Sequence, residues 1–305
     1  MRNMIFAVIA MATAAFASAD GAAADEWKKL LAPADLAALA DEPLILDIRP
    51  PSSFARGHIE GAVNAPYGLW RGPRENPGRR LSDAALNQVL RQSGVERDRP
   101  VVVTFHGKGA SDFGSAARVY WTLKSAGISK IAILNGGLTA WVQAGLPLSQ
   151  TPTKIAPSTI DAQLSDRWML DADGVQAVLD GKVNARLVDA RPLGFFDGRN
   201  KHPAATKAGT LRGALRVLHS SWFGERGAVM ASTPAVVRQI VANAGYDAGQ
   251  ADGQMLVSFC NTGHWAATNW FALSEVAGIE NVKLYPESMV GWSNRGGEVV
   301  AGHEG

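Results

Sequence analysis

Cysteine is nearly absent from this chain: its 305 residues contain one, Cys260. A single cysteine excludes a disulfide within the chain. A lone cysteine is most often a small buried hydrophobic residue, but a cysteine among loop N–H groups at a helix N-terminus can be a nucleophile. The stretch MLVSFCNTGHWAATNWFAL (255–273) places Cys260 between a short apolar run and a segment with the pattern of a helix. Both interpretations are open at this point.

Other absences exclude classes of function. The chain has no basic run with interleaved aromatic residues and a formal charge of only +2, so nothing indicates a nucleic-acid partner. It has no low-complexity block, and beyond the N-terminus no apolar run is long enough to cross a membrane. With 47% hydrophobic and 19% charged residues the composition is that of a globular protein. The length predicts about two domains, each with its own core.

The first 19 residues have the pattern of a cleavable secretory signal peptide. Arg2 precedes the apolar run MIFAVIAMATAAFA, and Ala17-Ser18-Ala19 fits the small-residue cleavage site. Ala22-Ala23-Ala24 is a second possible site. Because the composition looks bacterial, we expect a periplasmic protein with no membrane contact after cleavage. In an oxidising compartment an unpaired thiol is a candidate reactive group.

The second half of the chain repeats the first at an offset of about 150 residues, which indicates two homologous domains in tandem. One pair of segments sets VVVTFHG (101–107) against QMLVSFCN (254–261), so that His106 stands opposite Cys260. A stretch rich in Pro, Ser and Thr separates the two units. The predicted divisions are a signal peptide at 1–19, a first domain at 25–148, a linker at 149–165 and a second domain at 166–300.

Each unit alternates short β-branched runs with amphipathic helical stretches. This alternation predicts the α/β class, with a parallel sheet in each unit and helices on both of its faces. In such sheets ligands bind beyond the carboxyl ends of the strands. Cys260 lies at the carboxyl end of the predicted strand 255–259, and a helix is predicted over about 266–277. This location favours the nucleophile.

These features together resemble the rhodanese family of sulfurtransferases in its tandem two-domain form. The resemblance covers about residues 25–297. The motifs that carry it are Asp47-x-Arg49, ARGHIEGAVNAP (55–66), NGGLTAW (135–141), Cys260-Asn261-Thr262-Gly263 and YPESMVGW (285–292). The resemblance implies that the second domain is catalytic. It also implies that the first is not, because His106 stands where the nucleophile would be.

The activity that the resemblance implies is transfer of sulfane sulfur, without a cofactor. Cys260 would take sulfur from a donor such as thiosulfate or 3-mercaptopyruvate, become a persulfide, and pass the sulfur to a thiophilic acceptor. The acceptor could be cyanide, a small thiol or a thiol protein. An alternative is a periplasmic persulfide carrier or sulfur-binding protein that turns over no small molecule, because both need the same loop.

Two further possibilities fit the sequence poorly. A phosphatase on the same fold needs an arginine at the sixth position after the cysteine, and Ala266 stands there. A metal site at Cys260 and His264 would lack a third ligand nearby, so no metal is expected.

The loop after the predicted strand holds most of the candidate site. Its N–H groups are expected to form an anion nest around a solvent-reachable Cys260 thiolate, with Gly263 allowing close approach to the sulfur. His264 could donate a hydrogen bond to the substrate, act as an acid or base, or be an ordinary loop histidine. The residues proposed to bind substrate are Asn261, Thr262, Gly263, His264, Trp265 and Arg199. Asp189 and Arg191 are expected to support the loop, with direct substrate contact as the alternative.

Three departures from the family pattern bear on the donor. Asn261 holds the place of an arginine that often follows the cysteine in thiosulfate-using members. Phe195 stands where the family has a substrate-binding arginine. The segment GRNKHPAATKAGTLRGA (198–214) is longer and more basic than its counterpart, and Arg199 is one of its cations. That segment could recruit an anion or could be a solvated basic loop.

N-terminal sequencing of the protein from its native host tests the predicted export. The expected mature chain begins at Asp20, because cleavage follows Ala19. Soluble cytoplasmic protein that still begins with Met1 would contradict the prediction.

Overall fold

The computed structural model describes residues 27–40, 42–224, 227–246 and 253–303. The predicted signal peptide, 1–19, lies outside these described residues. Within the described ranges no helix has both the length and the apolar character needed to cross a membrane.

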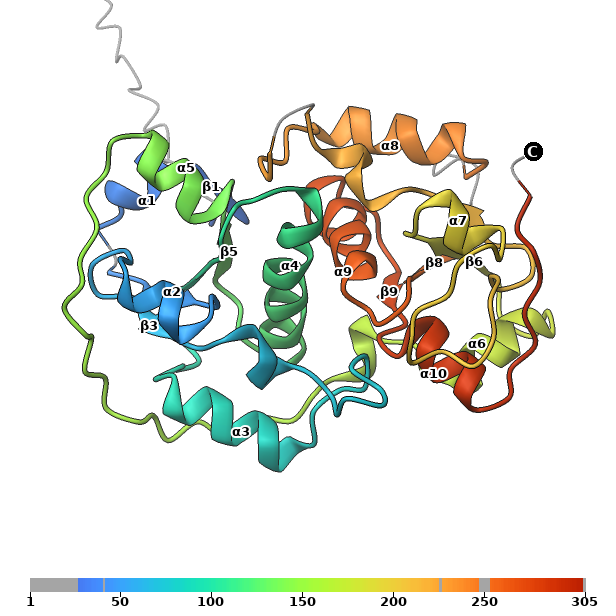
Figure 1. The fold of residues 1–305 in the computed structure, drawn as a ribbon, viewed down its shortest axis with the longest axis horizontal. Helices are drawn as coiled ribbons and strands as arrows, with labels where there is room; N and C mark the ends of the chain where they lie inside the picture. Colours follow the sequence, from blue (N-terminus) through green and yellow to red (C-terminus); the bar gives the residue numbers. More distant parts are fainter. Residues whose placement is uncertain (1–26, 41, 225–226, 247–252, 304–305) are drawn as a thin grey trace, which may run out of the picture.

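Two parallel sheets, one in each half of the chain, form the framework (Figure 1). The first has the strand order β1-β5-β4-β2-β3 and the second the order β7-β6-β8-β9. The strands are β1 (Leu30–Leu31), β2 (Leu44–Asp47), β3 (Val63–Asn64), β4 (Val101–Thr104), β5 (Ile131–Leu134), β6 (Ala185–Asp189), β7 (Leu215–Arg216), β8 (Met255–Phe259) and β9 (Val282–Leu284). The predicted α/β class with two tandem parallel-sheet units is confirmed.

The helices follow the strands in the order that the repeat predicts. Those of the first half are α1 (Pro33–Ala37), α2 (Pro51–Ala55), η1 (Tyr67–Trp70), α3 (Asp83–Gln92), α4 (Ala110–Ser125) and α5 (Gly137–Gln143). Those of the second half are η2 (Asp166–Trp168), α6 (Ala172–Leu179), α7 (Leu193–Phe196), η3 (His219–Trp222), α8 (Pro234–Asn243), α9 (Trp265–Trp270), the π-helical η4 (Phe271–Val276) and α10 (Ser288–Asn294).

Helices cover both faces of each sheet because successive strand residues point to opposite faces. In the first sheet Leu46 and Val103 pack into the core that holds α3 and α4, while Ile45 and Val102 pack with α1 and α5. The second sheet divides in the same way between α8 and α9 on one face and α6 and α10 on the other.

One hydrophobic core runs through both halves, and its centre is the contact between α4 and α9 with its continuation η4 (Figure 1). The Phe271 ring lies 5.7 Å from Phe113 and 4.9 Å from Tyr120, centroid to centroid, in edge-to-face arrangements that aromatic pairs favour. The helix that bears the Cys260 loop is therefore held from the side by the first domain.

A buried ion pair adds polar specificity to this interface. The Glu275 carboxylate, 1% exposed, accepts from Lys124 Nζ at 2.6 Å and from the Tyr120 hydroxyl at 2.8 Å. A buried carboxylate that lost these partners would be strongly destabilising. The two halves therefore have one favoured way of docking.

The predicted linker, 149–165, is not a free tether. It runs along the outside of the first domain (Figure 1), where Asn87 exchanges two hydrogen bonds of 2.8 Å with the backbone of Ala162. Ile160 and Ala162 are buried in the common core. The segment is therefore packed against the first domain.

Candidate active site

The loop that carries Cys260 begins directly after β8 and ends at α9. Cys260 follows Phe259, the last residue of β8, and α9 starts at Trp265, with η4 extending the helical stretch to Val276. This is the strand–loop–helix arrangement that the sequence predicts.

The Cys260 side chain is buried in the structure, with an exposed fraction of 1%. The expectation of a solvent-reachable thiol is therefore wrong for this conformation. The reason is tertiary: Cys260 belongs to the core that both domains share, and first-domain side chains contact the loop residues that follow it. Tyr67 and Arg118 lie close enough to interact electrostatically with the sulfur.

Two N–H groups of the expected anion nest point at a serine instead of the sulfur. The backbone N–H groups of Cys260 and Gly263 donate to Ser288 Oγ at 3.0 and 3.1 Å, and Ser288 donates to the Tyr285 carbonyl at 2.9 Å. Ser288 has a φ of +51°, a left-handed conformation that is uncommon outside glycine. Its hydroxyl is therefore held in place to fix the turn of the loop.

Position 263 has to be glycine, because the Pro286 carbonyl and the Arg118 guanidinium leave no room for a side chain. Its φ is +70°, and a Cβ there would lie 2.3 Å from the Pro286 carbonyl oxygen and 2.4 Å from Arg118 Nη1. The close approach of these two groups is one reason for glycine, and the expected close approach of the backbone to the sulfur stays a prediction.

Asp189 and Arg191 form a buried ion pair at the end of β6 that reaches the loop. Arg191 Nε and Nη2 donate to the Asp189 carboxylate at 2.9 and 2.6 Å, and Nη2 also donates to the Gly209 carbonyl. The remaining nitrogen, Nη1, donates to Asn261 Oδ1 at 3.3 Å. The pair thus orients the residue that follows the cysteine.

Arg199 is not brought to this loop. Its guanidinium pairs with Asp197 at 2.6 Å on the surface, where the Arg199 side chain is 69% exposed. Among the described residues it has no hydrogen bond or ion pair to 260–265. The reason is local: an acidic residue two positions earlier neutralises the cation. Two other cations of the segment, Lys201 and Lys207, donate to backbone carbonyls.

The cations at the loop come from the first domain, and sequence reasoning missed them. Arg71 Nη2 donates to the Thr262 carbonyl at 2.7 Å, and Arg118 Nη1 to the Gly263 carbonyl at 3.4 Å. Arg71 Nη1 and Arg118 Nε are buried and have no hydrogen-bond partner within the part of the chain that the structure describes. A signal for Arg118 was present, because it interrupts the apolar helical stretch RVYWTL.

These two arginines crowd each other. Burial, together with the neighbouring Arg71 charge, lowers the pKa of Arg118 to about 9, while Tyr67 and Cys260 act in the opposite direction. Arg118 is therefore still charged at neutral pH. An anion at the loop would be attracted by two desolvated positive charges.

His264 is held by two first-domain groups. Its Nε2 lies 2.6 Å from the Ser111 carbonyl oxygen, so it must donate there, and Nδ1 accepts from the Tyr67 hydroxyl at 2.9 Å. Burial, followed by the charge of Arg71, lowers the pKa of His264 to about 4. The ring is neutral at pH 7 with both nitrogens occupied, which favours a role in docking the loop over acid–base chemistry.

Trp265 is also tied to the first domain. Its Nε1 donates to Ser111 Oγ at 2.7 Å, and its ring stacks on His219 with 4.6 Å between centroids. The Trp265 ring also makes an edge-to-face contact with Phe195, at 6.1 Å between centroids. Aromatic side chains therefore line this side of the loop.

No group of three or more His, Cys, Asp or Glu side chains suited to a metal ion occurs among residues 27–40, 42–224, 227–246 and 253–303.

This chain is similar to known proteins over most of its length. The model of the rhodanese-like domain matches residues 32–144. "Putative thiosulfate sulfurtransferase 1" of Mycobacterium bovis is 27% identical over 259 residues, covering 82% of this chain and 87% of the relative. "Putative thiosulfate sulfurtransferase SseB" of Mycobacterium tuberculosis is 29% identical over 284 residues, covering 87% and 94%.

Solved structures show the same fold. The wild-type structure of EanB aligns with a TM-score of 0.73 at 20% identity, over 85% of this chain. A structure of an EanB variant with a cysteine persulfide and ergothioneine aligns with a TM-score of 0.74 at 19% identity, also over 85%. The present chain spans only 64% and 65% of the lengths of those two chains.

The depressed pKa of His264 predicts how stability depends on pH. The unfolded chain binds this proton below the ordinary pKa of 6.5, whereas the folded chain binds it only near pH 4. Stability from this group is therefore present above pH 6.5 and is lost as the pH falls toward 4. Urea unfolding of His264→Gln, which can keep both hydrogen bonds without titrating, should show a shallower loss between pH 6.5 and 4.5.

His303→Gln is the control, because His303 is exposed. Identical pH slopes for His264→Gln and the wild type would contradict the burial of a neutral His264.

Proposed function

Because the chain is a rhodanese-like domain protein, homologous over most of its length to sulfurtransferases, we propose that it moves sulfane sulfur through a persulfide on Cys260. The donor is a small sulfur compound such as thiosulfate, and the acceptor is thiophilic: cyanide, a small thiol or a protein thiol. The observation that carries the proposal is the position of the cysteine, at a strand end near the buried Arg118 and the half-buried Arg71 of the other domain.

The reaction has two balanced steps. The Cys260 thiolate attacks the outer sulfur of thiosulfate, the sulfur–sulfur bond breaks, and sulfite leaves with the bonding electron pair. Cyanide then attacks the outer sulfur of the persulfide, thiocyanate leaves, and the thiolate is restored. A thiolate is needed because a thiol is a poor nucleophile.

Arg71 and Arg118 supply the positive charge for this chemistry. Both are desolvated at the loop, where their attraction for an anionic donor and for the thiolate is stronger than it would be in water. Arg71 Nη1 has no hydrogen-bond acceptor among the described residues, so its N–H groups are available to an oxygen atom of thiosulfate. We propose that these cations take the place of the arginines that the family pattern leads one to expect at Asn261 and Phe195.

Turnover requires movement, because the sulfur is 1% exposed. The contacts that close the loop are those of Tyr67 and Ser111 with His264 and Trp265. Opening of these first-domain contacts would admit the donor, and their closure would keep water out. The proposed compartment is the periplasm, on the basis of residues 1–19.

The experiment compares the wild type with Cys260→Ser. With thiosulfate or 3-mercaptopyruvate and no acceptor, mass spectrometry should find one added sulfur on the wild-type peptide that contains Cys260. Cyanide should remove it as thiocyanate. Cys260→Ser should lose the adduct and at least about 1,000-fold in turnover, because a hydroxyl cannot hold sulfane sulfur.

Two other outcomes are informative. An adduct without steady-state turnover by either donor would support the carrier function instead. Sulfur transfer by Cys260→Ser at nearly the wild-type rate would overturn both.

A matched pair of arginine variants tests the anion site. Arg71→Gln should lower kcat/KM for thiosulfate about ten-fold or more, because a charge-assisted contact to the donor is lost. Arg74→Gln removes an exposed arginine three residues away and should leave kcat/KM within about two-fold. Equal effects of the two substitutions would mean that Arg71 is not a specific donor contact. Arg71→Lys keeps the positive charge and removes the guanidinium that donates to the Thr262 carbonyl, so its kcat/KM separates the effect of the charge from that of the hydrogen bond.

A further inference from the structure

The first domain has a pocket where the second domain has its cysteine loop. The pocket has a volume of about 490 Å³ and lies beyond the carboxyl ends of β2 and β4. Residues from the end of β2, the loop after β4 and the start of α4 form most of its wall, with Tyr67 and His264 on the side facing the Cys260 loop. His106, the counterpart of Cys260, is among its lining residues.

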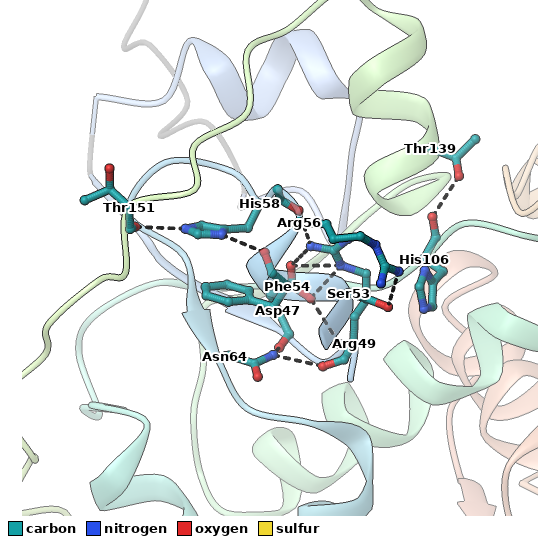
Figure 2. Close-up of polar contacts among 11 residues, drawn as sticks. Asp47, Arg49, Ser53, Phe54, Arg56, His58, Asn64, His106, Thr139 and Thr151 are labelled. Carbon is teal, nitrogen blue, oxygen red and sulfur yellow. Dashed lines mark hydrogen bonds and ion pairs between the residues drawn. The ribbon is translucent and has the colours of Figure 1, made fainter. Parts of the chain in front are cut away.

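The buried ion pair at this pocket repeats that of the second domain, with one bond missing. Arg49 Nε and Nη2 donate to the Asp47 carboxylate at 2.9 and 2.6 Å (Figure 2). Arg191 donates to Asp189 in the same way. Arg191 Nη1 goes on to bind Asn261. Arg49 Nη1 has no hydrogen-bond partner among the described residues, although the side chain is only 5% exposed and lines the pocket.

Arg49 Nη1 lacks this hydrogen bond because Gly107 occupies the position in the repeat that is equivalent to Asn261. Gly107 has a φ of +83°, and a Cβ there would lie 1.9 Å from the Gly136 carbonyl oxygen. No side chain fits at this position, so the loop cannot supply an acceptor for Arg49. The pocket thus contains a charge-bearing N–H group that has no acceptor among the described residues, and a charge-assisted hydrogen bond to an anion could form there.

Other groups of the pocket complement this donor. Lys108 is exposed and makes no ion pair in the described part of the chain. The His106 carbonyl accepts from Thr139 (Figure 2), and no described residue hydrogen-bonds its ring. One oxygen of the Asp112 carboxylate, Oδ2, accepts from the N–H groups of Gly107 and Lys108, at 2.8 and 3.1 Å. Ile48, Pro50 and Phe105 add apolar wall.

We propose that this first-domain pocket binds a small anion with oxygen acceptors, which Arg49 Nη1 and Lys108 hold together. An inorganic oxyanion and a carboxylate share this chemistry, and the pocket has room for either. The site is distinct from Cys260, but it shares Tyr67 and His264 with the contacts that close the loop. The inference does not depend on sulfur transfer, because it concerns binding alone.

Isothermal titration of the full chain with sulfate and, separately, acetate tests the site. Saturable binding of one ion per chain is expected for at least one probe. The probe with the lower Kd shows whether the site prefers an inorganic oxyanion or a carboxylate. Lys108→Met should raise the Kd about two- to five-fold, as expected for an exposed charge. Lys108→Glu should raise it further, because it places a like charge beside the anion.

Lys130→Met is the matched control. Lys130 is an exposed lysine just before β5, at the opposite end of the same sheet, and its substitution should leave the Kd unchanged. Arg49→Gln should abolish binding if circular dichroism shows that the variant folds. If it does not fold, the Kd values of the Lys108 and Lys130 variants still test the proposal.

Three results would overturn the proposal. One is the absence of saturable binding by either probe. Another is an equal effect of Lys108→Met and Lys130→Met. The third is binding that disappears in Arg71→Gln and persists in Lys108→Glu, because the anion would then occupy the Cys260 loop.

Discussion

A buried aspartate–arginine pair at the end of a central strand is the constraint on which both halves of this protein depend. In the second domain Asp189 holds Arg191 so that its free nitrogen reaches Asn261 and sets the loop of Cys260. In the first domain Asp47 holds Arg49 in the same way, but the nitrogen meets only a pocket. Buried charges need partners. The same ion pair therefore fixes a loop where Asn261 accepts from the arginine, and borders a pocket where Gly107 stands at the equivalent position.

The division of labour between the domains is electrostatic as well as steric. The second domain contributes the cysteine, while the cations that attract an anion to it, Arg71 and Arg118, belong to the first. The docking of α4 against α9 buries Arg118, which lies on α4, and also the Glu275 carboxylate that pairs with Lys124. A domain without the nucleophile is thus needed to complete the electrostatics of the proposed reaction. Cys260 is almost fully buried in this arrangement, so the state seen here is a closed one.

Much of the fold was predictable because it follows from local pattern. Runs such as 44–47 and 101–104 are apolar and β-branched, and their spacing from helical stretches dictates parallel strands with crossover helices. The strand end at Phe259 also fixed where Cys260 would lie. Burial of the thiol and the direction of two loop N–H groups toward Ser288 were not predictable. Both depend on residues distant in sequence: Ser288 lies 28 positions from Cys260, and Tyr67 lies 197 from His264.

The sequence by itself determined the two repeats, the α/β class, the strand-end position of the single cysteine and the Asp-x-Arg pairs. These depend on periodicity and on neighbours within one strand and its loop. Only the tertiary structure decided which cations serve the loop, placing Arg71 and Arg118 there while Asp197 retains Arg199 at the surface. The physical reason is that electrostatic partners are chosen by proximity in space. That proximity arises here from the docking of two domains whose contact surfaces leave no periodic signal in the chain.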